Sequence, residues 1–347
     1  MLNANPPTGR RMALVTILTL LGLCVAVVCG LAIGPIPIGT MRIIGSIFSR
    51  IGIGHSTLNS TQFSIVWQLR APRLVLGLLA GAMLSVAGGT YQGVFRNPLA
   101  DPYLLGVAAG AGLGATFAIM DIGGGTYTPT WTPLLAFAGA MVAVSITWII
   151  GGRGLRSSAS TLILAGVAVA ALLTSLQTYL QQQASAQSLA RVYIWLLGSL
   201  ASASWSSVDL VLPYVLVCVM ICVAAGRALD VMSVGEDESR SLGVPVRRVR
   251  FIVIAASSLG TAAIVSAVGL IGFVGIIVPH IVRLLVGTSY RRILPLSVAF
   301  GAAFLVFADT IARTVIAPSE LPLGVVTALV GAPVFVLILS FRRQLVR

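Results

Sequence analysis

Long apolar runs separated by short polar segments recur along the whole chain. A helix that crosses a hydrocarbon core of about 30 Å needs roughly 20 predominantly apolar residues, and many of these runs reach that length. The pattern predicts an all-α polytopic membrane protein with about ten transmembrane helices. The predicted spans lie near residues 12–33, 74–94, 103–120, 132–150, 160–181, 206–226, 250–268, 271–287, 294–313 and 323–341. We expect residues 182–205 to hold one further short helix that does not cross.

The composition agrees with this membrane interpretation. Of the 347 residues, 57% are hydrophobic and 9% are charged, whereas a soluble domain carries roughly a quarter charged residues. Apolar spans continue from one end of the sequence to the other. Residues 1–347 are therefore predicted to form a single transmembrane domain.

All 22 basic residues are arginine, and their positions predict the orientation of the chain. Cytoplasmic loops of membrane proteins carry an excess of basic residues. Ten crossings with both termini in the cytoplasm place most arginines on that side. These are Arg10, Arg11, Arg96, Arg153, Arg156, Arg227, Arg240, Arg247, Arg248, Arg250, Arg291, Arg292, Arg342, Arg343 and Arg347. The formal net charge of +13 thus reflects topology, and nucleic-acid binding is rejected as its explanation.

Several kinds of chemistry have no signature in the sequence. No G-x-x-x-x-G-K-S/T phosphate-binding loop occurs, so this chain carries no predicted nucleotide-binding domain, and any ATP must bind to another chain. His55 and His280 cannot form a transition-metal site by themselves, and we expect no metal or cofactor on this chain. The four cysteines lie in predicted spans, where they act as small apolar side chains. They are Cys24, Cys29, Cys218 and Cys222.

Glycines spaced four residues apart indicate close helix packing. The pairs are Gly77 and Gly81, Gly89 and Gly93, and Gly110 and Gly114, with a further small-residue face at Gly269, Gly272 and Gly275. Small residues at this spacing allow two helix backbones to approach closely. Ordinary helix packing is the favoured interpretation, and a lining that slides or opens is the alternative.

A charged island interrupts the apolar pattern at residues 235–245. Glu236, Asp237 and Glu238 are three of the nine acidic residues of the chain, and carboxylates are costly to leave in lipid. The island is predicted to form one or two short helices, which stop at Gly243 and restart after Pro245. It is either a solvated loop or a surface that receives force from a separate motor, and the residues alone favour neither.

Two further groups of charged residues lie near predicted span ends. Arg70 and Arg73 are three apart around Pro72, which suits a first helical turn with both guanidinium groups on one side. From the residues alone, they can be interfacial anchors whose charged ends reach the polar boundary of the membrane. Asp309 precedes Arg313 by four residues and is expected to hold it in place, although an intramembrane carboxylate is also a candidate proton carrier.

Motifs along the chain resemble the membrane subunits of FecCD-type ABC importers. They include Leu69-Arg70-Ala71-Pro72-Arg73, Asn97-Pro98-Leu99-Ala100-Asp101-Pro102, Gly235-Glu236 with Leu242-Gly243-Val244-Pro245, Val278-Pro279-His280, Asp309 with Arg313, and Glu320-Leu321-Pro322-Leu323-Gly324. The resemblance runs from about residue 64 onward. It implies a BtuC-like, type II importer fold.

The resemblance also implies partners and a location. The chain would be a permease in the bacterial cytoplasmic (inner) membrane. Its expected partners are a second permease, with a copy of this chain preferred to a related one, a dimer of ATP-binding subunits that hold ATP and Mg, and a periplasmic or lipoprotein substrate-binding protein. The chain itself would be a transport subunit and no enzyme.

Site roles follow from the same resemblance, residue by residue. Contacts with the ATPase are assigned within residues 229–250, to Gly235, Glu236, Asp237, Glu238, Ser239, Leu242, Gly243 and Pro245. Docking of the binding protein is assigned to Arg70, Arg73 and Arg313. The pathway and its gate are assigned to Ala159, Ser160, Thr161 and Gln177. Structural motif positions are Asn97, Pro98, Pro279, His280 and Asp309.

The predicted function is import of a bulky metal chelate, a ferric siderophore or haem, by alternating access. A cobalamin importer is the close alternative, because the lining motifs do not distinguish these cargoes. An ion-coupled secondary transporter that uses Asp309 as its proton carrier is the alternative from another class. A channel is less favoured, since no ring of charge or filter sequence occurs.

Overall fold

The computed structural model describes residues 9–50, 52, 55, 57–120, 131–152 and 159–344, with the backbone alone for residues 338–344. These residues form helices joined by short connections, without a strand in the described ranges. The helices are α1 (Gly9–Ala32), α2 (Thr40–Arg50), α3 (Ser60–Ser64), the π-helix η1 (Ile65–Arg70), α4 (Ala71–Phe95), α5 (Val107–Met120), α6 (Trp131–Gly152), α7 (Ala159–Gln182), α8 (Ala186–Leu196), α9 (Trp205–Ala224), α10 (Gly226–Met232), α11 (Glu236–Ser241), α12 (Val246–Val268), α13 (Val274–Val286), α14 (Tyr290–Ala312) and α15 (Leu323–Gln344).

The predicted spans are confirmed as helices. Among the described residues, seven helices are long and apolar enough to cross a membrane, and the shorter apolar helices α5, α13 and α15 supply the remaining predicted spans. The expected short helix between the fifth and sixth spans is α8. Arg153, Arg156 and Arg347 lie outside the described residues, as do the side chains of Arg342 and Arg343.

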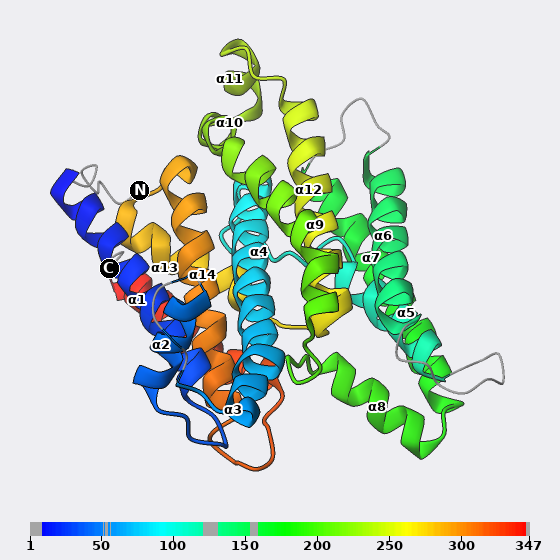
Figure 1. The fold of residues 1–347 in the computed structure, drawn as a ribbon. Coiled ribbons are helices and arrows are strands. Elements are labelled where there is room, and N and C mark those ends of the chain that lie inside the picture. Colours follow the sequence, from blue (N-terminus) through cyan, green and yellow to red (C-terminus); the bar gives the residue numbers. More distant parts are fainter. Residues whose placement is uncertain are drawn as a thin grey trace.

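Helix α4 lies at the centre of the bundle and packs most extensively against α14 (Figure 1). Helices α12, α13 and α9 surround the rest of it, while α5, α6 and α7 form a group on one side and α1 lies on the other. Helix α4 is apolar all round and buried on most of its surface, which is the pattern of an interior helix.

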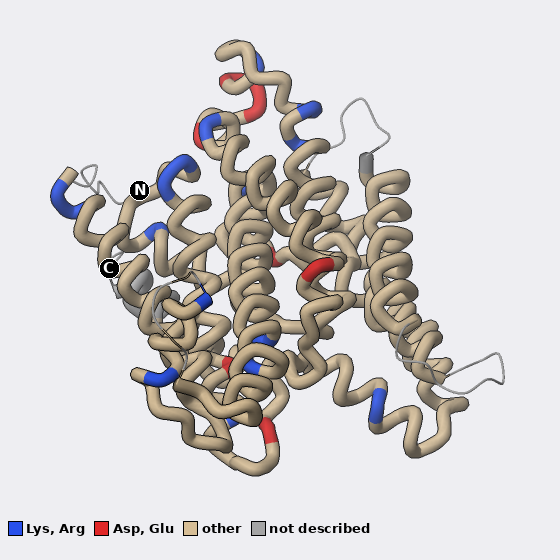
Figure 2. Tube along the Cα trace, viewed as in Figure 1, with Lys and Arg blue, Asp and Glu red and all other residues tan. Residues whose placement is uncertain are grey.

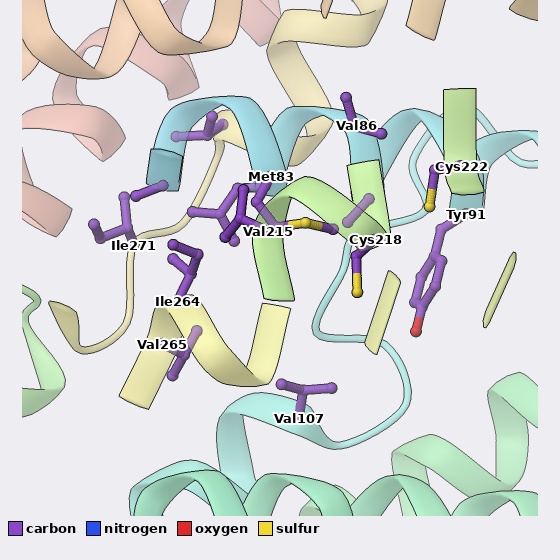
Figure 3. Packing of buried hydrophobic residues seen from close by; sticks show 14 of the residues in the cluster. Met83, Val86, Tyr91, Val107, Val215, Cys218, Cys222, Ile264, Val265 and Ile271 are labelled. Atoms are coloured by element: carbon purple, nitrogen blue, oxygen red, sulfur yellow. The ribbon is translucent and has the colours of Figure 1, made fainter. Parts of the chain in front are cut away.

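The core between α4, α9 and α12 combines apolar side chains with a satisfied polar group. Met83 of α4 extends toward Val215 and Cys218 of α9, as Figure 3 shows. Tyr91 is fully buried, and its hydroxyl lies 2.6 Å from Ser258 Oγ. A buried tyrosine hydroxyl needs such a partner, because an unpaired one is costly in an apolar interior.

Glycines bring the backbones of neighbouring helices together, as the four-residue spacing predicts. A Cβ atom added to Gly81 of α4 would lie 2.1 Å from the carbonyl oxygen of Gly301 in α14. One added to Gly110 of α5 would lie 2.3 Å from the carbonyl oxygen of Gly139 in α6. Separations this short leave no room for a side chain, so these contacts depend on glycine.

Charged residues gather toward the two ends of the bundle, and the long helices between them are mostly uncharged (Figure 2). One end carries α10 and α11, and the other carries α2, α3 and α8 (Figure 1). We call the end with α10 and α11 the α11 end, and the end with α2, α3 and α8 the Arg73 end.

Candidate functional site

The helix that carries Arg70 and Arg73 starts earlier than the sequence pattern indicates. It runs from Ser60 to Phe95 and begins with a capping box, in which Gln62 N donates to Asn59 Oδ1 over 2.8 Å. Pro72, which the sequence places in the first helical turn, therefore lies inside the helix. A proline has no N–H to donate, and the π-helical turn η1 immediately before it accommodates the irregularity.

Arg70 is buried against the end of another helix. It is 5% exposed, and its Nη1 donates to the carbonyl oxygens of Leu31 at 2.7 Å and Ala32 at 3.0 Å, while Nη2 donates to that of Ile36 at 2.5 Å. The last carbonyls of a helix lack partners within it and favour a cation. Arg70 thus fastens the C-terminus of α1 to η1.

Arg313 has the same kind of environment. It is 4% exposed, and its Nη2 donates to the carbonyl oxygen of Gly30 at 2.5 Å. Two of the three arginines assigned to docking therefore bind backbone carbonyls near the end of α1. In this conformation their guanidinium groups are turned into the protein.

Arg73 differs from them, because it binds two carboxylates. Its Nε donates to Asp309 Oδ2 at 3.0 Å and its Nη2 to Asp309 Oδ1 at 2.8 Å. Its Nη1 and Nη2 donate to Glu320 Oε1 at 2.8 Å and Oε2 at 2.9 Å. The expectation that Arg70 and Arg73 present their guanidinium groups to one side is wrong, because Arg70 turns to α1 and Arg73 to α14 and the segment after it.

The predicted pairing of Asp309 with Arg313 is present but secondary. Arg313 Nε lies 3.8 Å from Asp309 Oδ2, a longer separation than the 2.8 Å between Asp309 and Arg73. Sequence spacing reveals the neighbour four residues away in the same helix, but it cannot reveal Arg73, which is 236 positions distant. Glu320 was also missed as a site residue, although it opens the Glu320-Leu321-Pro322 motif.

The charged island at the opposite end folds as predicted. Helix α11 spans residues 236–241, Gly243 adopts φ +79°, and α12 starts directly after Pro245. Ser239 is buried, and its Oγ donates to the carbonyl oxygens of Val231 and Gly235. The island is therefore a folded unit that packs on α10.

The island has an inner face bound to the bundle and an outer face open to contact. Glu236 forms an ion pair with Arg250 of α12, whose side chain is 8% exposed. On the outer face Asp237 is 93% exposed and Leu242 is 69% exposed; Gly243 and Pro245 are exposed as well. An apolar side chain within a charged rim is typical of a protein contact surface.

Asp230, which the sequence did not single out, ties this end to α14. Its Oδ2 accepts a hydrogen bond from Ser289 Oγ at 2.7 Å, and its Oδ1 accepts one from Tyr290 N at 2.5 Å. An acidic side chain at a helix N-terminus satisfies an unpaired N–H and complements the helix dipole. Helix α14 thus joins α10 at one end of the bundle to Arg73 at the other end, where its Asp309 binds that arginine.

Changing Glu236 to glutamine is expected to loosen α11 from the bundle, because the charged contact between Glu236 and Arg250 of α12 is lost. A hydrogen bond to a charged group contributes about 1.5–3 kcal/mol, which corresponds to roughly 10- to 150-fold faster amide exchange by local opening. Hydrogen exchange of peptides covering residues 229–245 measures this. Asp237→Asn is the matched control, since it removes the same charge but affects only an exposed ion pair with Arg240 within α11. An equal increase in both variants would contradict the role of the ion pair.

The assigned pathway residues lie at both ends of α7. Gln177 is buried and lines a hollow of about 470 Å³ on the side of α5, α7 and α8, whereas Ala159, Ser160 and Thr161 form the first turn of α7, at the other end of that helix. A neighbouring hollow of about 530 Å³ shares several of the same residues. The shared residues are Tyr103, Ala108, Leu196 and Leu270. Both linings are uncharged.

The structural motif residues have packing and turn contacts. Asn97 Oδ1 accepts a hydrogen bond from Leu99 N at 3.0 Å and shapes the turn that contains Pro98. Pro279 lies within α13, where a Cβ atom on Gly89 would come within 3.4 Å of it. The adjacent His280 is buried. These positions belong to the connection after α4 and to the contact between α4 and α13.

Comparisons with known proteins show which family and which relatives this chain resembles. The profile of the FecCD transport family matches residues 20–341. YvrB of Bacillus subtilis, an uncharacterized ABC transporter permease, is 40% identical over 326 residues, which cover 91% of this chain and 90% of the relative. The cobalamin import permease BtuC of Halobacterium salinarum is 41% identical over 282 residues, covering 80% of this chain and 74% of the relative.

A third relative and a solved structure extend the comparison. The vitamin B12 import permease BtuC of Escherichia coli O9:H4 is 39% identical over 280 residues, covering 80% of this chain and 84% of that protein. The structure of a proposed metal-chelate type ABC transporter in an inward-facing conformation has 28% identity and a TM-score of 0.82. The match covers 93% of this chain and 98% of that chain.

Proposed function

The chain belongs to the FecCD transport family and is an ABC importer permease of the metal-chelate and cobalamin type, and from this premise we propose how its two ends and its hollows serve transport. The cargo is a bulky metal chelate of the class formed by ferric siderophores, haem and cobalamin. The observation that carries the proposal is the arrangement along the bundle: a folded charged island at one end, an arginine cluster at the other, and uncharged hollows on the side of α5, α7 and α8.

The arginine distribution supports the orientation. The excess of basic residues on the α11 side supports a cytoplasmic location for that end. There the outer face of the island meets a dimer of ATPase subunits that bind ATP and Mg. The Arg73 end then faces a substrate-binding protein. A second permease, a copy of this chain, completes the pathway that the uncharged hollows border.

Transport proceeds by alternating access. ATP-driven closure of the ATPase pair moves α10 and α11, and the ion pair of Glu236 with Arg250 passes the movement to α12. The contact of Asp230 with Ser289 and Tyr290 passes it to α14. An uncharged lining suits this cycle, because a large chelate has to slide along the pathway without binding tightly to it.

An ion-driven carrier is disfavoured by the surroundings of Asp309. A proton-carrying carboxylate has to lose and regain its proton during each cycle, whereas Asp309 is held by two hydrogen-bonded contacts with Arg73 and lies near Arg313. These contacts make Asp309 a counter-ion that ties α4 to α14. Asp309 is therefore assigned a structural role.

Site-specific photo-crosslinking tests the partners. Because the sequence contains no lysine, lysine-directed reagents are unsuitable, and benzoylphenylalanine is placed instead at Leu242 and at Val315, which are 69% and 63% exposed. We expect an ATPase subunit crosslinked from Leu242 and a substrate-binding protein crosslinked from Val315 in native membranes. The chelate bound to that second protein identifies the cargo.

The matched control is benzoylphenylalanine at Leu210 of α9, which is 58% exposed on a helix predicted to span the membrane. It should yield neither partner. Absence of an ATPase adduct from Leu242, together with uptake by this chain reconstituted alone, would overturn the importer and restore the ion-driven alternative.

A further inference from the structure

Asp309 and Glu320 hold Arg73 from two sides, and the fold fixes the two acids unequally. The side chain of Asp309 is 7% exposed within α14, whereas that of Glu320 is 33% exposed at the end of a run of exposed residues, 315–320. Exposed ion pairs contribute about 0–1 kcal/mol, and breaking a buried pair costs roughly 3–5 kcal/mol. The contact of Arg73 with Glu320 is thus the one that can open while the fold stays intact.

The geometry of Arg73 permits one carboxylate to replace another. Its Nε edge faces Asp309, while Nη1 and Nη2 each donate to one oxygen of Glu320. This paired arrangement is the one that arginine adopts with carboxylates generally. A carboxylate that arrives from the surrounding solution can form the same two hydrogen bonds once Glu320 turns away.

We propose that Glu320 is a resident placeholder for a carboxylate of the docking protein. In the resting permease it orients Arg73 and balances its charge, and an acidic group of the binding protein takes its place when the two proteins meet. The inference rests on the proposed function for the nature of the partner. It adds a competitor within the permease itself, so that docking affinity is set by the exchange of one carboxylate for another.

Charge complementarity favours the exchange. The cluster contains three arginines, Arg70, Arg73 and Arg313, against the two carboxylates of Asp309 and Glu320. Because Arg70 and Arg313 are buried against backbone carbonyls, their charge stays within the cluster while Arg73 alone offers hydrogen-bond donors to a partner. An acidic partner therefore gains the attraction of the whole cluster, whereas Glu320 has to remain near it in any case.

The segment that follows Glu320 is anchored beside a hollow by its own backbone hydrogen bonds. The segment that carries Glu320 continues into α15, where Leu323 N donates to the carbonyl oxygen of Gly198 at 3.0 Å and Gly324 N to that of Leu197 at 2.9 Å. Leu197 and Gly324 line the hollow of about 530 Å³. These backbone hydrogen bonds do not involve the side chain of Glu320, so it can leave Arg73 while the start of α15 stays in place.

Chemical modification of Arg73 tests the placeholder in the purified permease alone. Phenylglyoxal modifies accessible guanidinium groups, and peptide mass spectrometry follows each arginine separately. We expect Glu320→Gln to raise the modification rate of Arg73 by about two- to fivefold, the range set by an exposed ion pair. Arg313 should stay protected, and Glu320→Asp should keep part of the protection. An unchanged rate at Arg73 in the folded Glu320→Gln variant would overturn the proposal.

An acidic probe peptide tests the exchange itself. A fluorescent hexaglutamate should bind Glu320→Gln permease in nanodiscs about two- to fivefold more tightly than the wild type, with affinity falling as salt rises. Asp209→Asn is the matched control, because Asp209 is an exposed acid of α9 whose loss changes the net charge equally. An equal gain in peptide affinity in both variants would show that net charge alone causes the effect. It would overturn the proposal that Glu320 competes with the peptide for Arg73. Neither measurement involves an ATPase, so these results stand apart from crosslinking at Leu242.

Discussion

Gly88→Leu permease is expected to be lost from the folded, monodisperse fraction. A Cβ atom at Gly88 of α4 would lie 1.9 Å from the carbonyl oxygen of Gly275 and 2.5 Å from its Cα. Both atoms belong to backbone, so no side chain can turn aside to make room. Overpacking a core costs about 1–3 kcal/mol where side chains can adjust, and a backbone clash in the central helix exceeds that.

Fluorescence-detected size-exclusion chromatography of the tagged permease measures this loss. The matched control is Gly22→Leu in α1, where an added Cβ would meet no atom within 4 Å. That variant should keep the wild-type elution profile. A normal profile for Gly88→Leu would mean that α4 and the start of α13 are not in this close contact, and the central packing described above would be wrong.

Gly22 and Gly88 show which structural features the sequence can predict and which it cannot. Helical spans follow from the length of apolar runs, because crossing lipid imposes a length and excludes unpaired backbone groups. Glycine spacing predicts that some helix faces are flat. The partner of each flat face depends on the three-dimensional arrangement. The sequence therefore cannot distinguish Gly88, which lies against Gly275, from Gly22, where an added Cβ would meet no atom within 4 Å.

The different roles of the three clustered arginines were unpredictable for the same reason. Arg70, Arg73 and Arg313 are alike in the sequence, since each lies at the end of an apolar run. Their roles separate only when α1 supplies carbonyl oxygens to two of them and α14 with the following segment supplies carboxylates to the third. The charged island was easier to predict, because Gly243 and Pro245 set the local backbone within a few residues of each other.

Asp309→Ala is expected to destabilise the permease strongly. After the change, Glu320 is the one carboxylate among the described residues that remains beside Arg73. The positive charges of Arg73 and the two neighbouring arginines then lie close together without the buried carboxylate of Asp309. Removing one partner of a buried ion pair costs about 3–5 kcal/mol, compared with about 0–1 kcal/mol for the exposed contact of Glu320. Thermal unfolding of the detergent-purified variants should therefore rank Asp309→Ala far below Glu320→Gln.

A double variant separates a structural carboxylate from a proton carrier. Replacing a buried ion pair by apolar side chains of similar volume is often neutral, so Arg73→Met combined with Asp309→Leu should recover most of the stability that Asp309→Ala loses. The recovered protein should still accept photo-crosslinks to the ATPase at Leu242 but lose the acidic probe peptide. If Asp309 instead carried protons, Asp309→Asn would fold like the wild type and abolish uptake driven by a pH gradient. Normal melting of Asp309→Ala would likewise exclude the structural role, because a buried arginine cluster cannot lose its fixed counter-charge without cost.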